Sequence, residues 1–160
     1  MVWEMDVRGI DCIVKLITWH CVTADAISVV YERDGREEQT KQWGNPEGER
    51  SEICLESDEY LTGVKGRFGN YNGYVLVGSV TFVSNRHTFG SYGMGEGAPF
   101  ELPVAGGRII GFHGCSGGGG RGSSTLLAPT SRLANYQDSP CYVMSFFCLC
   151  QLMTEGQSVE

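Results

Sequence analysis

The sequence is short of basic residues. Its 160 residues contain 12 Lys and Arg against 19 Asp and Glu, which gives a net charge of −7, and no three basic residues are consecutive. A surface that binds nucleic acid through its phosphates needs clustered cations. The balance of charge therefore predicts no nucleic-acid partner.

The sequence also lacks the cysteine patterns of disulfide frameworks and zinc sites. Its seven cysteines are odd in number and irregularly spaced, and no C-x-x-C pair occurs. Such a set favours free thiols and predicts no metal site. There is no Asn-x-Ser/Thr glycosylation sequon, and the first ten residues have no apolar core of the kind found in signal peptides. These absences predict a reducing, intracellular compartment, and we expect a cytoplasmic protein.

Long apolar segments are missing too. The longest apolar run is Cys141–Met153, which is shorter than the roughly 20 residues that a helix needs to cross a bilayer. The sequence therefore predicts no membrane span. Gly-X-Y repeats are absent, which excludes collagen, but 41% of the residues are apolar, enough for a buried core.

Short runs typical of β-strands recur between residues 11 and 113. No stretch before residue 121 shows an apolar period of 3.6, and turn signals separate the runs. Asp34-Gly35 predicts a tight hairpin, residues 69–73 a loop, and Gly78 a bulge within a strand. The pattern predicts an all-β fold with strands at Cys12–Trp19, Ile27–Tyr31, Glu52–Leu55, Tyr60–Val64, Tyr74–Val83, His87–Tyr92, Pro99–Val104 and Arg108–His113.

Composition changes near residue 117. Eighteen of the 23 glycines lie between residues 63 and 122, and Gly117–Gly120 is an uninterrupted glycine run. We expect a domain over residues 1–120, followed by a divergent, partly disordered tail over 121–160. Within the tail, Cys141–Met153 is compatible with a strand or a short buried helix, and we expect it to fill a sheet edge or to drive self-association.

Motifs for catalysis are weak. Gly114-Cys115-Ser116-Gly117-Gly118 resembles a G-x-S-x-G nucleophile elbow, but glycines follow in place of a helix, and no His lies downstream of His113. His20 and Cys21 are adjacent, so on a strand they point to opposite faces and do not share a ligand. We therefore expect no catalytic residue, no metal and no cofactor.

Several segments together resemble the jacalin-related lectins of plants. Their order and spacing agree over roughly residues 3 to 117. The resemblance implies a β-prism of three Greek-key antiparallel sheets, here incomplete at its N-terminal and C-terminal strands. It also implies carbohydrate binding, often of mannose or glucose, without catalysis or metal. The segments are Trp3–Val7, Asp25–Ile27, Trp43-Gly44, Glu59–Val64, Ser79–Asn85, Thr88–Gly90, Pro99–Val104 and Gly107–Gly114.

The same resemblance implies the site residues. In the family, a G-x-x-x-D loop binds the sugar through its Asp; here Gly117 matches the Gly, but Arg121 stands at the Asp position. Arginine has donors and no acceptor, so it cannot receive hydroxyl protons as a carboxylate does. Asp25 matches the Asp of a second such loop, with Cys21 replacing its Gly. Tyr74 and Val75 match a loop that flanks the sugar.

The expected function is therefore a non-catalytic lectin domain that recognises mannose/glucose-type glycans or glycoproteins with its principal sugar loop degraded. Its carbohydrate-binding residues would be Asp25, Tyr74, Val75 and Gly117. The alternative is a degenerate lectin-like module that binds another protein and no sugar. A second copy of the chain is a further candidate partner.

Overall fold

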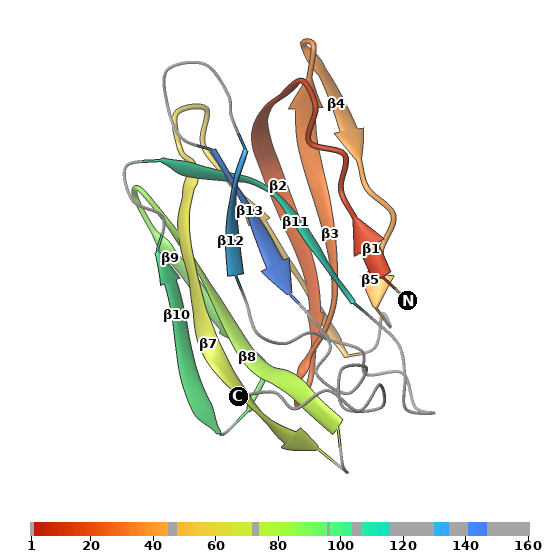
Figure 1. Ribbon diagram of the computed structural model, residues 1–160, viewed down its shortest axis with the longest axis vertical. Coiled ribbons are helices and arrows are strands. Elements are labelled where there is room, and N and C mark those ends of the chain that lie inside the picture. Colours follow the sequence, from red (N-terminus) through yellow and green to blue (C-terminus); the bar gives the residue numbers. More distant parts are fainter. Residues whose placement is uncertain are drawn as a thin grey trace.

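The computed structural model describes residues 2–44, 48–71, 74–95, 97–103, 107–115, 130–134 and 141–146. These residues form thirteen strands joined by turns and short connections (Figure 1). The described part contains no helix that could cross a membrane. The all-β class predicted from the sequence is confirmed.

The first sheet is built from the strands of the first third of the chain. Hydrogen bonds join them in the order β4-β3-β2-β6, and β5 pairs with the other end of β3. The fourth long strand thus returns beside the first, which is Greek-key order. The strands are β2 (Ile10–His20), β3 (Ala24–Arg33), β4 (Arg36–Gln39), β5 (Trp43–Gly44) and β6 (Glu49–Cys54).

The second face repeats this topology. Its order is β10-β7-β8-β9, again with the last strand beside the first. All pairs are antiparallel. The strands are β7 (Leu61–Tyr71), β8 (Tyr74–Ser84), β9 (Thr88–Tyr92) and β10 (Ala98–Pro103).

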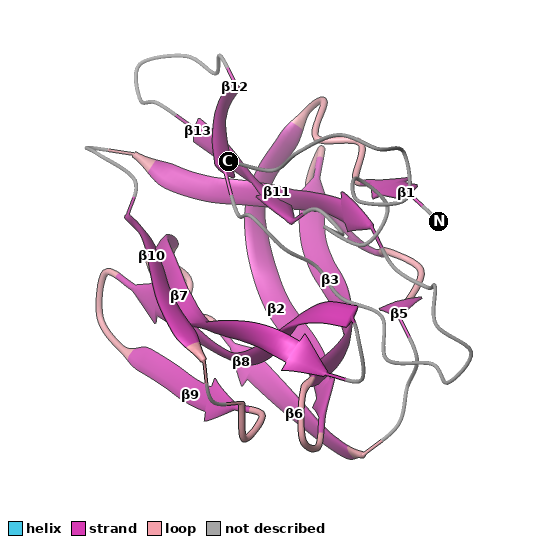
Figure 2. Ribbon diagram, turned by 60° about the horizontal axis from the view of Figure 1, so that its bottom comes forward, coloured by secondary structure: helices cyan, strands magenta, loops and turns pink. Residues whose placement is uncertain are grey.

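The third face has the order β1-β11-β13-β12 and joins the second through the single pair Ile109↔Leu61. This narrow joint lets one hydrogen-bonded sheet bend into two faces, so the molecule is a three-sided β-prism (Figure 2). The strands are β1 (Val2–Glu4), β11 (Arg108–Cys115), β12 (Thr130–Ala134) and β13 (Cys141–Phe146).

The third face differs from the expectation of antiparallel Greek-key sheets. Its strand β13 runs parallel to β11, with Arg108 opposite Cys141 and Gly114 opposite Phe146. Of the tail segment Cys141–Met153, predicted as a strand or a helix, Cys141–Phe146 is a strand, and residues 147–153 lie outside the described residues. Its position beside β11 agrees with the expectation that it fills a sheet edge.

The core lies where the three faces meet. Leu16, Val29 and Phe112 are completely buried, and Phe82 is 2% exposed. The rings of Phe82 and Phe112 meet edge to face with centroids 6.2 Å apart, which links the second and third faces. Burial of each such side chain contributes about 1.5–3 kcal/mol, so these contacts hold the faces together.

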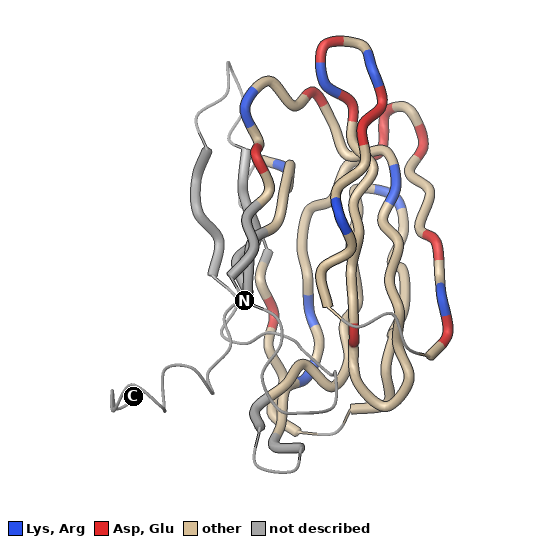
Figure 3. Tube along the Cα trace, turned by 90° about the vertical axis from the view of Figure 1, so that its right-hand side faces the viewer, with Lys and Arg blue, Asp and Glu red and all other residues tan. Residues whose placement is uncertain are grey.

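The predicted hairpin and bulge are both present. Asp34 and Gly35, between β3 and β4, have φ of 51° and 76°, which a two-residue turn with positive φ at both positions requires. Figure 3 shows the charged residues of this hairpin at the top of the molecule. The register of β7 against β8 shifts between the pairs Arg67↔Ser79 and Phe68↔Val77, so Gly78 is the extra residue.

The prediction of a loop over residues 69–73 is wrong for the first three of them, and residues 72 and 73 lie outside the described residues. The first three continue β7, and Gly69, Asn70 and Tyr71 pair with Leu76, Val75 and Tyr74. Polar and glycine residues suggest a loop by composition, but here the partner strand β8 supplies the hydrogen bonds. The consequence is a long hairpin that carries the start of β8 to the end of the prism.

Candidate functional site

Two chain reversals lie at one end of the prism. The β2–β3 turn closes at His20↔Ala24 and the β7–β8 hairpin at Tyr71↔Tyr74. Both lie at the lower end in Figure 1. This end therefore gathers the segments that hold the candidate residues Asp25, Tyr74 and Val75.

The structure places three of the predicted sugar-binding residues at the starts of two strands. Asp25 is the second residue of β3, and Tyr74 and Val75 are the first two residues of β8. These strands contact each other. Gly117 and Arg121 lie outside the described residues, so the predicted loss at the principal sugar loop stays a prediction. The structure thus brings one predicted carboxylate and one predicted flanking loop to the same end.

The Asp25 carboxylate is held in a fixed position. Asp25 is 6% exposed, and the hydroxyl of Thr23, itself buried, donates a hydrogen bond to Oδ1. The Thr23 bond orients the carboxylate, which as an ionised group acts only as an acceptor.

Cys21 does not strain this turn. Sequence analysis expected a steric penalty if the position required positive φ, but among the described residues Asp34 is the one non-glycine residue with positive φ. The turn closes through a hydrogen bond of 3.1 Å from the Cys21 N–H to the Thr23 carbonyl. The backbone thus accommodates Cys21 in an ordinary conformation.

A second loop braces the first. The Met94 N–H donates to the Val22 carbonyl at 3.0 Å, and the Gly95 N–H donates to the Gly78 carbonyl at 2.9 Å. A side chain at position 95 would place its Cβ 2.0 Å from the Gly78 Cα, so only glycine permits this backbone contact. The β2–β3 turn is therefore tied to β8 through residues 93–95.

Two apolar side chains stand exposed on these loops. Val22 is 54% exposed and Met94 is 77% exposed, and the backbone bond between them joins the two loops. The sequence patterns did not point to either residue. The signal that could have found Met94 is its place between Gly93 and Gly95, in the connection between two predicted strands. Together they put an apolar surface beside Asp25.

Aromatic rings line the strands next to the turn. The rings of His20 and Tyr92 lie 5.1 Å apart, and His20 Nε2 is 2.8 Å from Ser51 Oγ. Burial raises the pKa of the Tyr92 hydroxyl above its ordinary value. The Arg50 guanidinium lies 5.9 Å from the centre of the Trp19 ring. Trp19 therefore lies close to the turn, so its fluorescence can report a change there.

Metal-ligating residues do not gather in the described part of the chain, where no three His, Cys, Asp or Glu residues form a group that could hold an ion. Cys12, Cys21 and Cys54 are free thiols. Ser116, the residue of the weak hydrolase-like motif, lies outside the described residues. What the end of the prism offers is an oriented carboxylate beside apolar and aromatic groups, a combination suited to binding.

Comparison with known proteins decides the family. The model of the jacalin-like lectin domain matches residues 2–119. The chain belongs to the jacalin-like lectin family. It is similar to jacalin-related lectin 19 of Arabidopsis thaliana, with 40% identity over 108 residues, 65% of this chain and 60% of that protein. The matched part thus spans less than two thirds of that relative's length.

Other relatives differ in the sugar that their names give. A galactose-specific lectin of Morus indica is 35% identical over 95 residues, which are 58% of this chain and 60% of that protein. The solved structure of AcmJRL, a mannose-binding jacalin-related lectin from Ananas comosus, is 32% identical and covers 78% of this chain and 85% of its own, with a TM-score of 0.68. The jacalin-like β-prism is thereby established, and the family is one of carbohydrate-binding lectins that are generally non-catalytic.

Proposed function

We propose that this jacalin-like lectin domain binds mannose/glucose-type glycans at the end of the prism where Asp25 lies. The observation that carries the proposal is the Asp25 carboxylate, oriented by Thr23 on a turn braced by residues 93–95. A carboxylate accepts charge-assisted hydrogen bonds from sugar hydroxyls. The names of relatives that bind mannose and glucose support this choice of sugar.

The surrounding groups supply the rest of the binding surface. Val22 and Met94 offer apolar contact to the C–H face of a sugar ring. Tyr74 and Val75 start the neighbouring strand β8, at the position of the flanking loop in the family. Gly117, at the principal loop position, would contribute little because Arg121 replaces the acceptor there.

The domain acts without catalysis, in a reducing compartment such as the cytoplasm, where the free thiols of Cys12, Cys21 and Cys54 would persist. Its partners are glycans or glycoproteins. A second copy of the chain is a further partner, and the measured size of the protein in solution tests it.

A titration with methyl α-mannoside tests the proposal, followed by calorimetry and by Trp fluorescence. We expect weak saturable binding, with methyl glucoside second and methyl galactoside third. The Asp25→Asn variant keeps an acceptor for the Thr23 hydroxyl but loses the charge, so its affinity should fall about ten-fold or more.

The matched control is Asp34→Asn. Asp34 has φ 51° at the tip of the β3–β4 hairpin, a conformation that Asn adopts readily, and this hairpin lies at the opposite end of the prism. The control should bind sugar like the wild type. A folded wild-type protein that binds none of the three glycosides at millimolar concentration would contradict the proposal and favour the alternative of a protein-binding module.

A further inference from the structure

The flank of the second face carries a groove that the proposed site does not use. The groove has a volume of about 460 Å³ and spans the middle of β7, β8, β9 and β10. It lies on the outer side of the face, because the alternate residues Val64 and Val80 of the same strands belong to the core. Its lining residues are Lys65, Gly66, Arg67, Ser79, Thr81, Ser91, Pro99, Phe100 and Glu101.

The register arranges these residues in two rows across the strands. Glu101, Lys65 and Thr81 are direct neighbours in one row. Pro99, Arg67 and Ser79 form the other. Rows two residues apart are separated by roughly 7 Å, and neighbouring strands by about 4.8 Å. Each row therefore presents one cation from β7 beside one hydroxyl from β8.

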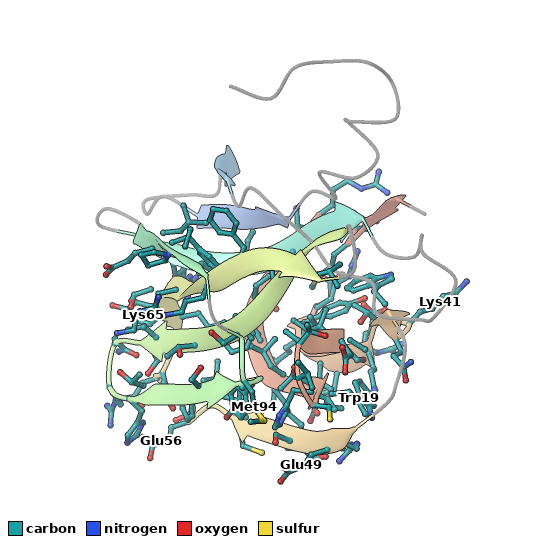
Figure 4. The ribbon with its side chains drawn as sticks, turned by 90° about the horizontal axis from the view of Figure 1, so that it is seen from below. Trp19, Lys41, Glu49, Glu56, Lys65 and Met94 are labelled. Atoms are coloured by element: carbon teal, nitrogen blue, oxygen red, sulfur yellow. The ribbon has the colours of Figure 1, made fainter. Side chains whose placement is uncertain are left out.

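The cations are available to a ligand. Lys65 and Arg67 are exposed, and neither forms an ion pair with an acidic side chain of the described residues. The Arg67 guanidinium donates one hydrogen bond of 2.8 Å, from Nη1 to the Gly97 carbonyl. This bond fixes the direction of the guanidinium and leaves its other N–H groups for an anion. In Figure 4, Lys65 lies at the outside of the molecule, away from the first sheet.

The floor is polar. Ser79 is 6% exposed and Thr81 is 8% exposed, and both line the groove. Ser91 and Glu101 are exposed on the two outer strands. The groove thus offers donors of positive charge, hydroxyls that donate and accept, and one carboxylate that only accepts.

We propose that this groove binds an acidic saccharide. Its carboxylate or sulfate would lie between Lys65 and Arg67, and its hydroxyls would bond to Ser79, Thr81 and the Glu101 carboxylate. A bare inorganic anion would gain from the cations but would be repelled by Glu101. A saccharide separates its acid group from its hydroxyls, so it can satisfy both kinds of partner at once. The groove is independent of Asp25, so this second site holds or fails apart from the proposed function.

Calorimetric titration of the full chain with trigalacturonate tests the proposal, compared with its neutral methyl ester and with sodium sulfate. We expect binding of trigalacturonate that weakens with added salt, and no binding of the ester. The Lys65→Ala/Arg67→Ala variant should bind at least about ten-fold more weakly, because each lost charge-assisted hydrogen bond is worth about that factor. The matched control is Lys41→Ala/Arg36→Ala, which removes the same charge from exposed positions elsewhere.

Two further variants separate saccharide binding in the groove from simple anion binding and from binding at the Asp25 site. Ser79→Ala/Thr81→Val should weaken trigalacturonate and leave any sulfate binding unchanged, because only the saccharide uses the hydroxyl floor. Asp25→Asn should leave trigalacturonate binding unchanged. The proposal is overturned by absent binding in folded protein, by equal binding of the ester, by sulfate binding as tightly as trigalacturonate, or by equal losses in the groove variant and its charge-matched control.

Discussion

At the scale of single residues, Asp25 and Cys21 illustrate what the sequence can and cannot decide. The family pattern points to Asp25 because its spacing within the loop is the same. The pattern cannot tell how the turn tolerates Cys21, which depends on the hydrogen bond to Thr23. It also gives no hint that the Thr23 hydroxyl would orient the Asp25 carboxylate.

Glu59 is a second buried carboxylate, far from the sugar site. Its side chain is 1% exposed and accepts hydrogen bonds from the Ser84 hydroxyl, from the Glu56 N–H at 3.0 Å and from His87 Nδ1 at 2.8 Å. Burial by itself raises the pKa of this carboxyl, but the hydrogen bonds outweigh it and hold the pKa below its ordinary value. Glu59 therefore fastens the connection before β7 to the turn between β8 and β9.

A Glu59→Gln variant should lose about 1.5–3 kcal/mol of unfolding free energy at pH 7. Its charge-assisted hydrogen bonds become neutral ones, and the NH2 group of the new amide faces a group that donated to the carboxylate. Since the folded pKa lies below the unfolded one, the contribution of Glu59 is present above the unfolded pKa and is lost as the pH falls through the folded pKa. Denaturant unfolding at pH 7 and in acid measures this.

The difference in unfolding free energy between the wild type and Glu59→Gln should therefore become smaller in acid. Nearby ionisable groups are Glu56, Asp58, Arg86 and His87. An Asp58→Asn variant is the control, since Asp58 is exposed and its ion pair with Arg86 lies at the surface. A difference in unfolding free energy that stays constant with pH would contradict the stabilising role of the Glu59 charge.

At the scale of elements, Gly95 determines how the two loops meet. A Gly95→Ala variant must move residues 93–95 away from Gly78, because the added Cβ would lie 2.0 Å from the Gly78 Cα. We expect a loss of about 1–3 kcal/mol in unfolding free energy, as for other overpacked sites, together with weaker sugar binding at the braced turn. Denaturant unfolding and the mannoside titration measure the two effects.

The control is Gly35→Asn in the β3–β4 hairpin. Gly35 has φ of 76° and no heavy atom within 4 Å of an added Cβ, so Asn is tolerated there. Unchanged stability in both variants would show that the loop gives way freely and that it does not brace the turn.

The strands that sequence analysis found are those with apolar alternation toward the core, such as β2, β3 and β8. It missed β4 because all four of its residues are exposed and charged or polar, so no alternation marks it. It missed β5 because two residues carry no pattern. These elements exist through hydrogen bonds to β3, and such pairing is not readable from local composition.

At the scale of the whole molecule, the prism depends on what covers β11. The strand pairs with β1 near its end, with β7 at a single position, and with β13 over most of its length. The family resemblance extended to about residue 117 and could not reveal the last pairing. Parallel pairing of Cys141–Phe146 arises from contacts distant in sequence, which no local pattern encodes.

The chain shortened to residues 1–120 tests this pairing. Without β12 and β13, those N–H and C=O groups of β11 that face β13 between Arg108 and Gly114 lose their partners, and an open edge pairs readily with another chain. We expect the shortened chain to unfold at lower temperature and to associate, as measured by calorimetry and size-exclusion chromatography. The control is a chain ending at Phe146, which keeps both strands and should match the full chain. If residues 1–120 remain monomeric with the melting temperature of the full chain, β13 does not protect the edge, and the tail contributes nothing to the prism.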